Sequence, residues 1–164
     1  MLRISKLMDY GTLVLTHMAA EPEKLHSASS LASALGLGPA TVSKILKMLT
    51  QHGLLGSTRG AKGGYSLAYK PEDINVAQVI DALDDQPFGL TECTANPGSC
   101  SVEADCHIRT NWERINAIVR KTLEEVTIAD MVAPVSGEPL VYHPSTSNNT
   151  SNRKISTTPS VELL

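Results

Sequence analysis

The three cysteines of this chain lie within a stretch of fourteen residues, at Cys93, Cys100 and Cys106. Thiolates are soft ligands, and a group of them is typical of a site for zinc, Cu(I) or an iron–sulfur cluster. Pro97 and Gly98 allow the loop to fold back, so that the three sulfur atoms can converge. Three thiols are one ligand short of the usual four. A histidine, a carboxylate, solvent or another chain would supply the last.

The spacing of these cysteines leaves the identity of the metal open. It matches neither the paired spacing of zinc ribbons nor that of ferredoxins, so zinc and an iron–sulfur cluster are both compatible with it, and three independent thiols are the alternative. The acidic neighbours Glu92, Glu103 and Asp105 oppose ionisation of the thiols when no cation is bound, which disfavours a catalytic nucleophile. An odd number of cysteines also argues against a disulfide framework.

The segment before the cysteine loop is basic, although the chain as a whole has a formal net charge of −3. Residues 24–70 contain six lysines and arginines and no acidic residue, whereas residues 71–109 contain eight acidic residues and a single arginine. A basic block in an acidic protein indicates a face that binds a polyanion, the alternative being an ordinary solvated surface.

Helical periodicity predicts three helices in the first third of the chain, over residues 2–20, 31–35 and 40–52. The third has a buried apolar stripe, formed by Val42, Ile45, Leu46 and Leu49. On its other face we expect Thr41, Ser43 and Lys44 to reach base edges and Lys47 to bind phosphate. Two helices joined by a tight glycine-containing turn, the second with such a face, form a helix-turn-helix; an ordinary helical hairpin is the alternative.

Two short strands are expected at residues 54–58 and 65–69, on either side of a glycine-rich tip. A hairpin directly after a recognition helix is a wing, and its glycines let the backbone approach DNA closely. Arg59 and Lys62 at the tip would bind phosphates or enter a narrow minor groove. The tip is not a nucleotide-binding phosphate loop, because it lacks a GKS or GKT ending and a helix that opens from it.

The second half of the chain is expected to form a short helix at residues 75–83, the cysteine loop, and a long helix at 106–126. Side chains at alternating spacings of four and three residues form a helix–helix seam on the long helix: Ile108, Trp112, Ile115, Val119, Thr122 and Val126. We therefore predict a homodimer through this helix; packing against its own domain is the alternative. A dimer would present two recognition helices to major grooves about 34 Å apart.

Together these patterns predict a mainly α fold with a small β-hairpin wing. A winged helix-turn-helix is expected over residues 1–70, a cysteine loop with a dimerisation helix over 71–133, and a disordered tail rich in Pro, Ser, Thr and Asn over 134–164. No apolar run approaches the roughly 18 residues of a membrane span. No signal peptide is recognisable, so a cytoplasmic protein is expected. No nucleophile–base pair stands out, and we expect no enzymatic activity.

Four segments resemble the IscR/NsrR-type iron–sulfur transcription regulators, and the last of them is most similar to the subgroup that regulates Suf-type cluster assembly. They are residues 3–10 (RISKLMDY), 40–46 (ATVSKIL), 59–65 (RGAKGGY), and the cysteine loop with the helix after it, including 106–112 (CHIRTNW) and 128–131 (IADM). The resemblance covers about residues 1–133. It implies a homodimeric repressor or activator that binds double-stranded promoter DNA and whose cluster state sets promoter occupancy.

The resemblance also implies a ligand set. Cys93, Cys100 and Cys106 would bind a [2Fe–2S] or [4Fe–4S] cluster, and Asp9 matches the residue of the partner subunit that is the fourth ligand in the NsrR type. The IscR type has a histidine three residues after the last cysteine, where this chain has Arg109. Six residues separate Cys93 from Cys100, where the family usually has five.

The predicted function is therefore a homodimeric regulator, a repressor in our interpretation, that senses iron–sulfur cluster status and controls cluster assembly genes. A repressor of the same family that senses nitric oxide or redox state is an alternative within this class. A zinc-stabilised interaction module would explain the cysteines without iron. An electron carrier or cluster-transfer protein would explain the cysteines but not the basic wing.

Overall fold

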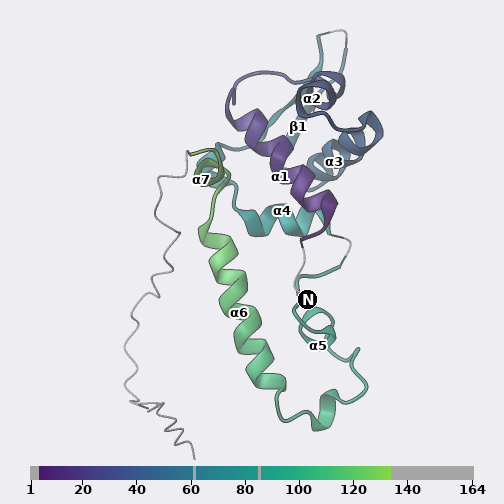
Figure 1. Ribbon diagram of the computed structural model, residues 1–164, viewed down its shortest axis with the longest axis vertical. Coiled ribbons are helices and arrows are strands. Elements are labelled where there is room, and N and C mark those ends of the chain that lie inside the picture. The colour runs from purple at the N-terminus through teal and green to yellow at the C-terminus, as the bar shows by residue number, and fades with distance from the viewer. Residues whose placement is uncertain (1–3, 61, 85, 134–164) are drawn as a thin grey trace, which may run out of the picture.

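The computed structural model describes residues 4–60, 62–84 and 86–133 (Figure 1); the predicted disordered tail lies outside them. In chain order the elements are α1 (Lys6–Ala19), α2 (Ala28–Leu35), α3 (Pro39–Gln51), β1 (Leu55–Thr58), β2 (Gly64–Leu67), α4 (Val76–Leu83), α5 (Glu92–Ala95), α6 (Arg109–Glu125) and α7 (Ile128–Val132), with 3-10 turns at Pro71–Asp73 and Glu103–Asp105.

The helix-turn-helix forms where the sequence predicts it; α3 is shifted by one residue, and the larger difference is the start of α2. α2 begins three residues earlier than expected, because the Ser27 hydroxyl accepts a hydrogen bond from the backbone N–H of Ser30 at 3.0 Å and caps the helix there. Gly36 ends α2 in the left-handed conformation, at φ +64°. Pro39 opens α3, where the missing N–H of proline is not needed.

One hydrophobic core joins elements from both halves of the chain. Leu15 of α1, Ile45 of α3, Val79 of α4 and Ile128 of α7 are all fully buried in it. α1 and α4 approach so closely at Gly11 that a Cβ atom on this residue would overlap the Leu83 side chain. The elements that follow the wing therefore pack against the same helices that position α3.

The hairpin is antiparallel, and its register pairs Leu55 with Leu67 and Thr58 with Gly64. The backbone of His26, in the segment before α2, extends this sheet by one bridge: His26 and Tyr65 exchange two N–H···O hydrogen bonds of 2.8 Å. A Cβ atom at Gly64 would lie 2.8 Å from the carbonyl oxygen of His26, so glycine permits this approach. The bridge fixes β2 of the wing to the segment that precedes α2.

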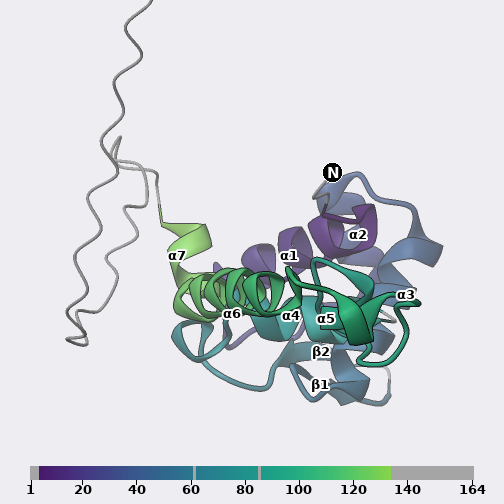
Figure 2. The same cartoon turned by 90° about the horizontal axis from the view of Figure 1, so that it is seen from below.

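The long helix predicted over residues 106–126 is shorter at its start and is followed by a second helix. α6 begins at Arg109, because Cys106 and the two residues after it form a turn. The chain becomes extended at Val126, Thr127 pairs with Asn75 in an isolated bridge, and the Thr127 side chain then caps α7. α6 extends from the winged-helix body to the cysteine loop (Figures 1 and 2), and the end of α6 nearer the body packs against α4.

The predicted fold class is confirmed: within the described ranges the protein is mainly helical and has a single two-stranded antiparallel hairpin. None of the helices described is long and apolar enough to cross a membrane.

Candidate DNA interface and cysteine loop

The buried and exposed faces of α3 divide as the periodicity predicts. Its four stripe residues, Val42, Ile45, Leu46 and Leu49, have no solvent exposure. Because a helix turns by 3.6 residues, the positions between them must face outward. Ser43, Lys44 and Lys47 are exposed, and Thr41, near the start of the helix, is half-buried. α3 therefore presents a hydroxyl and two lysines on one solvent-facing side.

The tip of the hairpin adds two further cations, since Arg59 and Lys62 are both exposed. Glycine is required beside them: Gly60 has φ +114°, and a Cβ atom at Gly63 would overlap the carbonyl oxygen of Thr58. Among the residues that the structure describes, Lys44, Lys47, Arg59 and Lys62 form no ion pair. Their charges are available to a polyanion.

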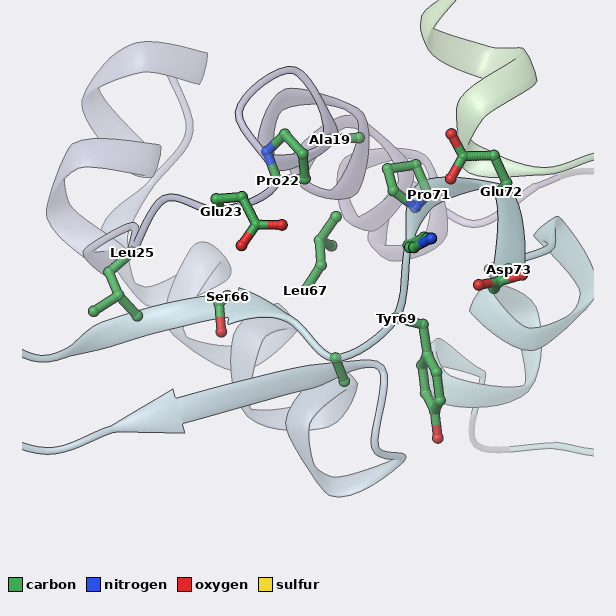
Figure 3. A pocket seen from close by; sticks show the side chains of 12 residues that line it. Ala19, Pro22, Glu23, Leu25, Ser66, Leu67, Tyr69, Pro71, Glu72 and Asp73 are labelled. Atoms are coloured by element: carbon green, nitrogen blue, oxygen red, sulfur yellow. The ribbon is translucent and has the colours of Figure 1, made fainter.

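A cavity of about 900 Å³ lies on another side of the hairpin, between the segment after α1 and the strand β2 with the turn that follows it (Figure 3). Glu23, Glu72 and Asp73 place three carboxylates around it, together with Leu25 and Tyr69. Lys70 also lines the cavity, but three carboxylates against one ammonium group make it unfavourable for phosphate oxygens. The exposed cations of α3 and the wing therefore remain the candidate surface for DNA.

The cysteine loop begins with α5, which lies at the far end of the molecule from the strand β1 of the wing (Figure 1). Cys93 is in α5, Cys106 follows the turn Glu103–Asp105, and Cys100 lies between them; all three are half-buried free thiols. The Sγ atom of Cys93 is 3.3 Å from the hydroxyl of Thr91. The structure thus keeps all three thiols on one loop and partly shielded from solvent.

The predicted ligands are not gathered around one point in this single chain. Across the described residues, no group of three histidine, cysteine, aspartate or glutamate side chains is placed to hold a metal ion. Asp9 is exposed in the first turn of α1. The donor set of three half-buried thiols suits an iron–sulfur cluster or zinc by its chemistry. Binding of either requires the loop to contract around the metal.

A carboxylate that sequence reasoning had treated only as an acidic neighbour organises the cysteine loop. The Oε2 atom of Glu103 accepts a hydrogen bond from the backbone N–H of Gly98 at 2.7 Å, and its Oε1 atom is 3.1 Å from Nη1 of Arg109. Arg109 also donates from Nε to Glu113 at 2.9 Å. These two carboxylates, Glu113 first, raise the pKa of Arg109 above its ordinary value. The four-residue spacing of Arg109 and Glu113 is visible in the sequence and is typical of an ion pair on a helix. No sequence pattern indicates the contact of Glu103 with Gly98.

A second contact that the sequence did not reveal joins α6 to the winged-helix body. Arg120 donates two hydrogen bonds of 2.6 Å to the carboxylate of Asp81 in α4, and its guanidinium lies 5.9 Å from the ring centroid of Phe88. The hydrogen bond to Asp81 is the main cause that raises the pKa of Arg120. Phe88 and Leu90 also line an apolar cavity of about 1110 Å³ between α1, α4, the loop and α6. The loop, α6 and α4 are thus physically connected.

The residues of the seam predicted on α6 fall into two groups, one exposed to solvent and one partly buried against the rest of the chain. Ile108, Trp112 and Ile115 are exposed, and Ile118 beside them is 45% exposed. Val119, Thr122 and Val126 are half-buried. The half of α6 nearer the cysteine loop therefore carries an apolar surface that nothing in the described chain covers.

Comparison with known proteins agrees with this architecture. The family model of Rrf2, described as an iron-dependent transcriptional regulator, matches residues 4–134. The protein rrf2 of Nitratidesulfovibrio vulgaris is 34% identical over 137 residues, covering 82% of this chain and 90% of that protein. The transcriptional regulator NsrR of Bacillus subtilis is 28% identical over 133 residues, covering 80% and 90%.

Two solved structures are similar in fold as well as in sequence. CymR of B. subtilis, named as the global cysteine regulator, is 28% identical, covers 80% of this chain and 97% of its own, and superposes with a TM-score of 0.63. IscR of T. potens is 30% identical, with coverages of 80% and 86% and a TM-score of 0.59.

These relatives are named transcriptional regulators, which confirms that the chain is not an enzyme. The winged-helix fold of this chain is shared with these two solved regulators. The chain belongs to the Rrf2 family of DNA-binding transcriptional regulators.

Proposed function

We propose that this protein is a homodimeric repressor that senses iron–sulfur cluster status through Cys93, Cys100 and Cys106 and controls genes for cluster assembly. The observation that carries the proposal is the pairing of two features in one chain: exposed cations on α3 and the wing, and three half-buried thiols on one loop. The iron-dependent description of the family and the IscR and NsrR relatives support the choice of iron.

In this proposal the residues of the winged helix divide the work of DNA recognition. Thr41, Ser43 and Lys44 contact base edges in the major groove of promoter DNA, because short side chains on an inserted helix reach them. Lys47, Arg59 and Lys62 neutralise phosphates or enter the minor groove. Residues 1–70 read DNA and residues 71–133 carry the sensor and the dimer contact.

The cysteine thiolates would hold a [2Fe–2S] or [4Fe–4S] cluster, which supplies a group that oxidants and nitric oxide can destroy. Asp9 of the partner subunit is the fourth ligand in the proposal, in keeping with its exposure on α1. A ligand on α1 matters because Leu15 of α1 and Ile45 of the recognition helix lie in one core. Loss of this tether would shift the two recognition helices of the dimer relative to each other.

The first test is an anaerobic visible absorption spectrum of the purified protein, with analysis of iron, acid-labile sulfide and zinc. We expect brown protein with iron and sulfide. Asp9→Ala should lower cluster content and change the affinity for promoter DNA; Asp73→Asn, which alters an exposed carboxylate in the turn after the wing, is the control. Wild-type cluster content and DNA affinity in Asp9→Ala would show that Asp9 is not the bridging ligand.

Two other outcomes would favour the alternatives. Colourless protein that stays empty after reconstitution but holds zinc would favour a zinc-stabilised module. A thiol-based redox sensor is favoured by the free state of the three thiols and by the similarity to CymR, the cysteine regulator. Protein without any metal whose DNA affinity changes on oxidation would select that alternative.

A further inference from the structure

We propose that Glu103 is a positioning residue for the cluster: its carboxylate ties both segments between the cysteines to the start of α6 and so limits the conformations that the loop can adopt before it closes around the cluster. The inference rests on the proposed function. Three positions are joined by this one side chain. Gly98 lies between Cys93 and Cys100, Glu103 lies between Cys100 and Cys106, and Arg109 is the first residue of α6.

The burial of Glu103 distinguishes it from the rest of the loop. Its side chain is only 9% exposed, although most of its neighbours, including the residues on either side of it, are exposed. Burying a carboxylate is costly unless its oxygens accept hydrogen bonds or pair with a cation. Both are: Oε2 to the N–H of Gly98 at 2.7 Å and Oε1 to Arg109 at 3.1 Å.

The Gly98 contact depends on a turn that the sequence builds for it. Gly98 has φ +86°, the left-handed region that favours glycine, and this conformation directs its N–H toward the carboxylate. The contact therefore fixes the middle of the longer segment between two cysteines. Without it, that segment is held by backbone hydrogen bonds such as the one from Ser99 to Asn96.

The charges indicate that Glu103 positions the loop and does not itself bind the metal. Both of its oxygens are already engaged, and Arg109 balances its charge, so the pair adds no net charge beside three thiolates. A loop that is already constrained loses less conformational entropy when it closes around a ligand. Weakening the contact should therefore slow cluster uptake and speed cluster loss.

The experiment compares the wild type with Glu103→Gln, which keeps an acceptor for Gly98 but loses the ion pair, and Glu103→Ala, which loses both. The matched control is Glu92→Gln. It removes one negative charge from the same loop, and the exposed side chain of Glu92 has no bonded partner in the described part of the chain. Arg109→Lys keeps the positive charge and should rescue part of the effect seen in Arg109→Ala.

Two readouts are measured on the full-length protein. With the cluster reconstituted, the loss of visible absorbance to an iron chelator should be about tenfold faster in Glu103→Ala, because a hydrogen bond to a charged group is lost. Glu103→Gln should be intermediate and Glu92→Gln unchanged. In cluster-free protein, the thiols of Glu103→Ala should react faster with an aromatic disulfide reagent. Circular dichroism of each cluster-free variant verifies that the fold is retained.

The outcomes separate this inference from the proposed function. Equal chelator kinetics and equal thiol reactivity in wild type, Glu103→Gln and Glu103→Ala would overturn the positioning role, while the bound cluster would still support the sensor. A Glu92→Gln variant as defective as Glu103→Gln would also overturn it, because net charge would then be the cause. A wild type that takes up no cluster under reconstitution would overturn both.

Discussion

At the scale of single residues, α3 carries two exposed side chains that we expect to contact DNA in different ways. Lys47 ends in a charge on a long flexible side chain, whereas Ser43 carries a short hydroxyl on the same exposed side. A cation that neutralises a phosphate contributes to binding of any sequence, while a hydrogen bond to a base edge contributes only at the correct base. The two substitutions should therefore differ in kind and not only in size.

We expect Lys47→Ala to weaken binding about equally for promoter and scrambled DNA and to reduce the slope of log affinity against log salt by about 1. Ser43→Ala should change the base preference and leave the salt slope unaltered. Titrations by fluorescence anisotropy over a series of salt concentrations measure both. Lys24→Ala is the control, since the ammonium group of Lys24 already pairs with Glu21 at 2.7 Å. A uniform loss from both α3 variants would contradict this division.

At the scale of elements, α7 is the part of the fold that periodicity did not reveal. It has five residues, too few for a helical pattern to be recognised, and it forms because Thr127 and Asp130 make a capping box. Its Ile128 is fully buried in the core with α1 and α3. The chain beyond α6 therefore returns to the winged-helix body.

Ile128→Ala should lower the free energy of unfolding by about 2 to 5 kcal/mol, the cost of a cavity in a packed core. Met131→Ala on the same short helix is the matched control, because Met131 is 49% exposed, and we expect a change within about 0.5 kcal/mol. Urea unfolding followed by circular dichroism, at one fixed protein concentration, measures both. Equal effects of the two substitutions would mean that α7 does not belong to the core.

The cap of α7 predicts a pH dependence. The carboxylate of Asp130 accepts hydrogen bonds from the backbone N–H and the hydroxyl of Thr127, at 2.8 and 2.7 Å, and the backbone bond is the main cause that lowers the pKa of Asp130 below its ordinary value. A lowered folded-state pKa means that the cap stabilises the protein above the ordinary carboxylate pKa. This contribution disappears as the pH falls through the folded-state pKa.

Asp130→Asn should therefore be less stable than the wild type at pH 7, and the difference should shrink below about pH 4. Urea midpoints at neutral and acidic pH measure this. Asp73→Asn, which replaces an exposed carboxylate with no hydrogen bond to its side chain in the described ranges, should show no such change. A constant difference between wild type and Asp130→Asn at all pH values would contradict the assignment.

At the scale of the whole molecule, the wing and the cysteine loop lie at opposite ends, and two elements connect them (Figure 1). α6 extends from the loop to the body, and the ion pair between Arg120 and Asp81 fixes it to α4. The exposed apolar residues Trp112 and Ile115 lie on this connecting helix. An apolar surface of this kind on the helix that links the two sites is suited to a second copy of the chain.

We expect Ile115→Glu to dissociate the proposed dimer, because a buried charge without a partner opposes association. Leu13→Glu on α1 is a close control, since Leu13 and Ile115 are both 43% exposed. Sedimentation velocity over a range of concentrations measures the oligomeric state. Promoter affinity should fall with dissociation, as one chain alone contacts one half-site. A dimer that survives Ile115→Glu but not Leu13→Glu would place the interface elsewhere.

Local sequence patterns determined much of the secondary structure of this protein. The buried stripe of α3, the glycine and proline boundaries of the helix-turn-helix and the hairpin after it depend on contacts within a few residues, so periodicity and turn chemistry predicted them. The grouping of Cys93, Cys100 and Cys106 is likewise visible in the chain itself.

Only the tertiary structure decided which distant groups meet. The pairing of Asp81 with Arg120, the bridge between His26 and Tyr65, and the position of Ile128 in the core join residues far apart in the chain, and no local pattern encodes such partners. The contact of Glu103 with Gly98 is shorter in range but depends on how the loop turns. These contacts depend on packing, which is a property of the whole fold.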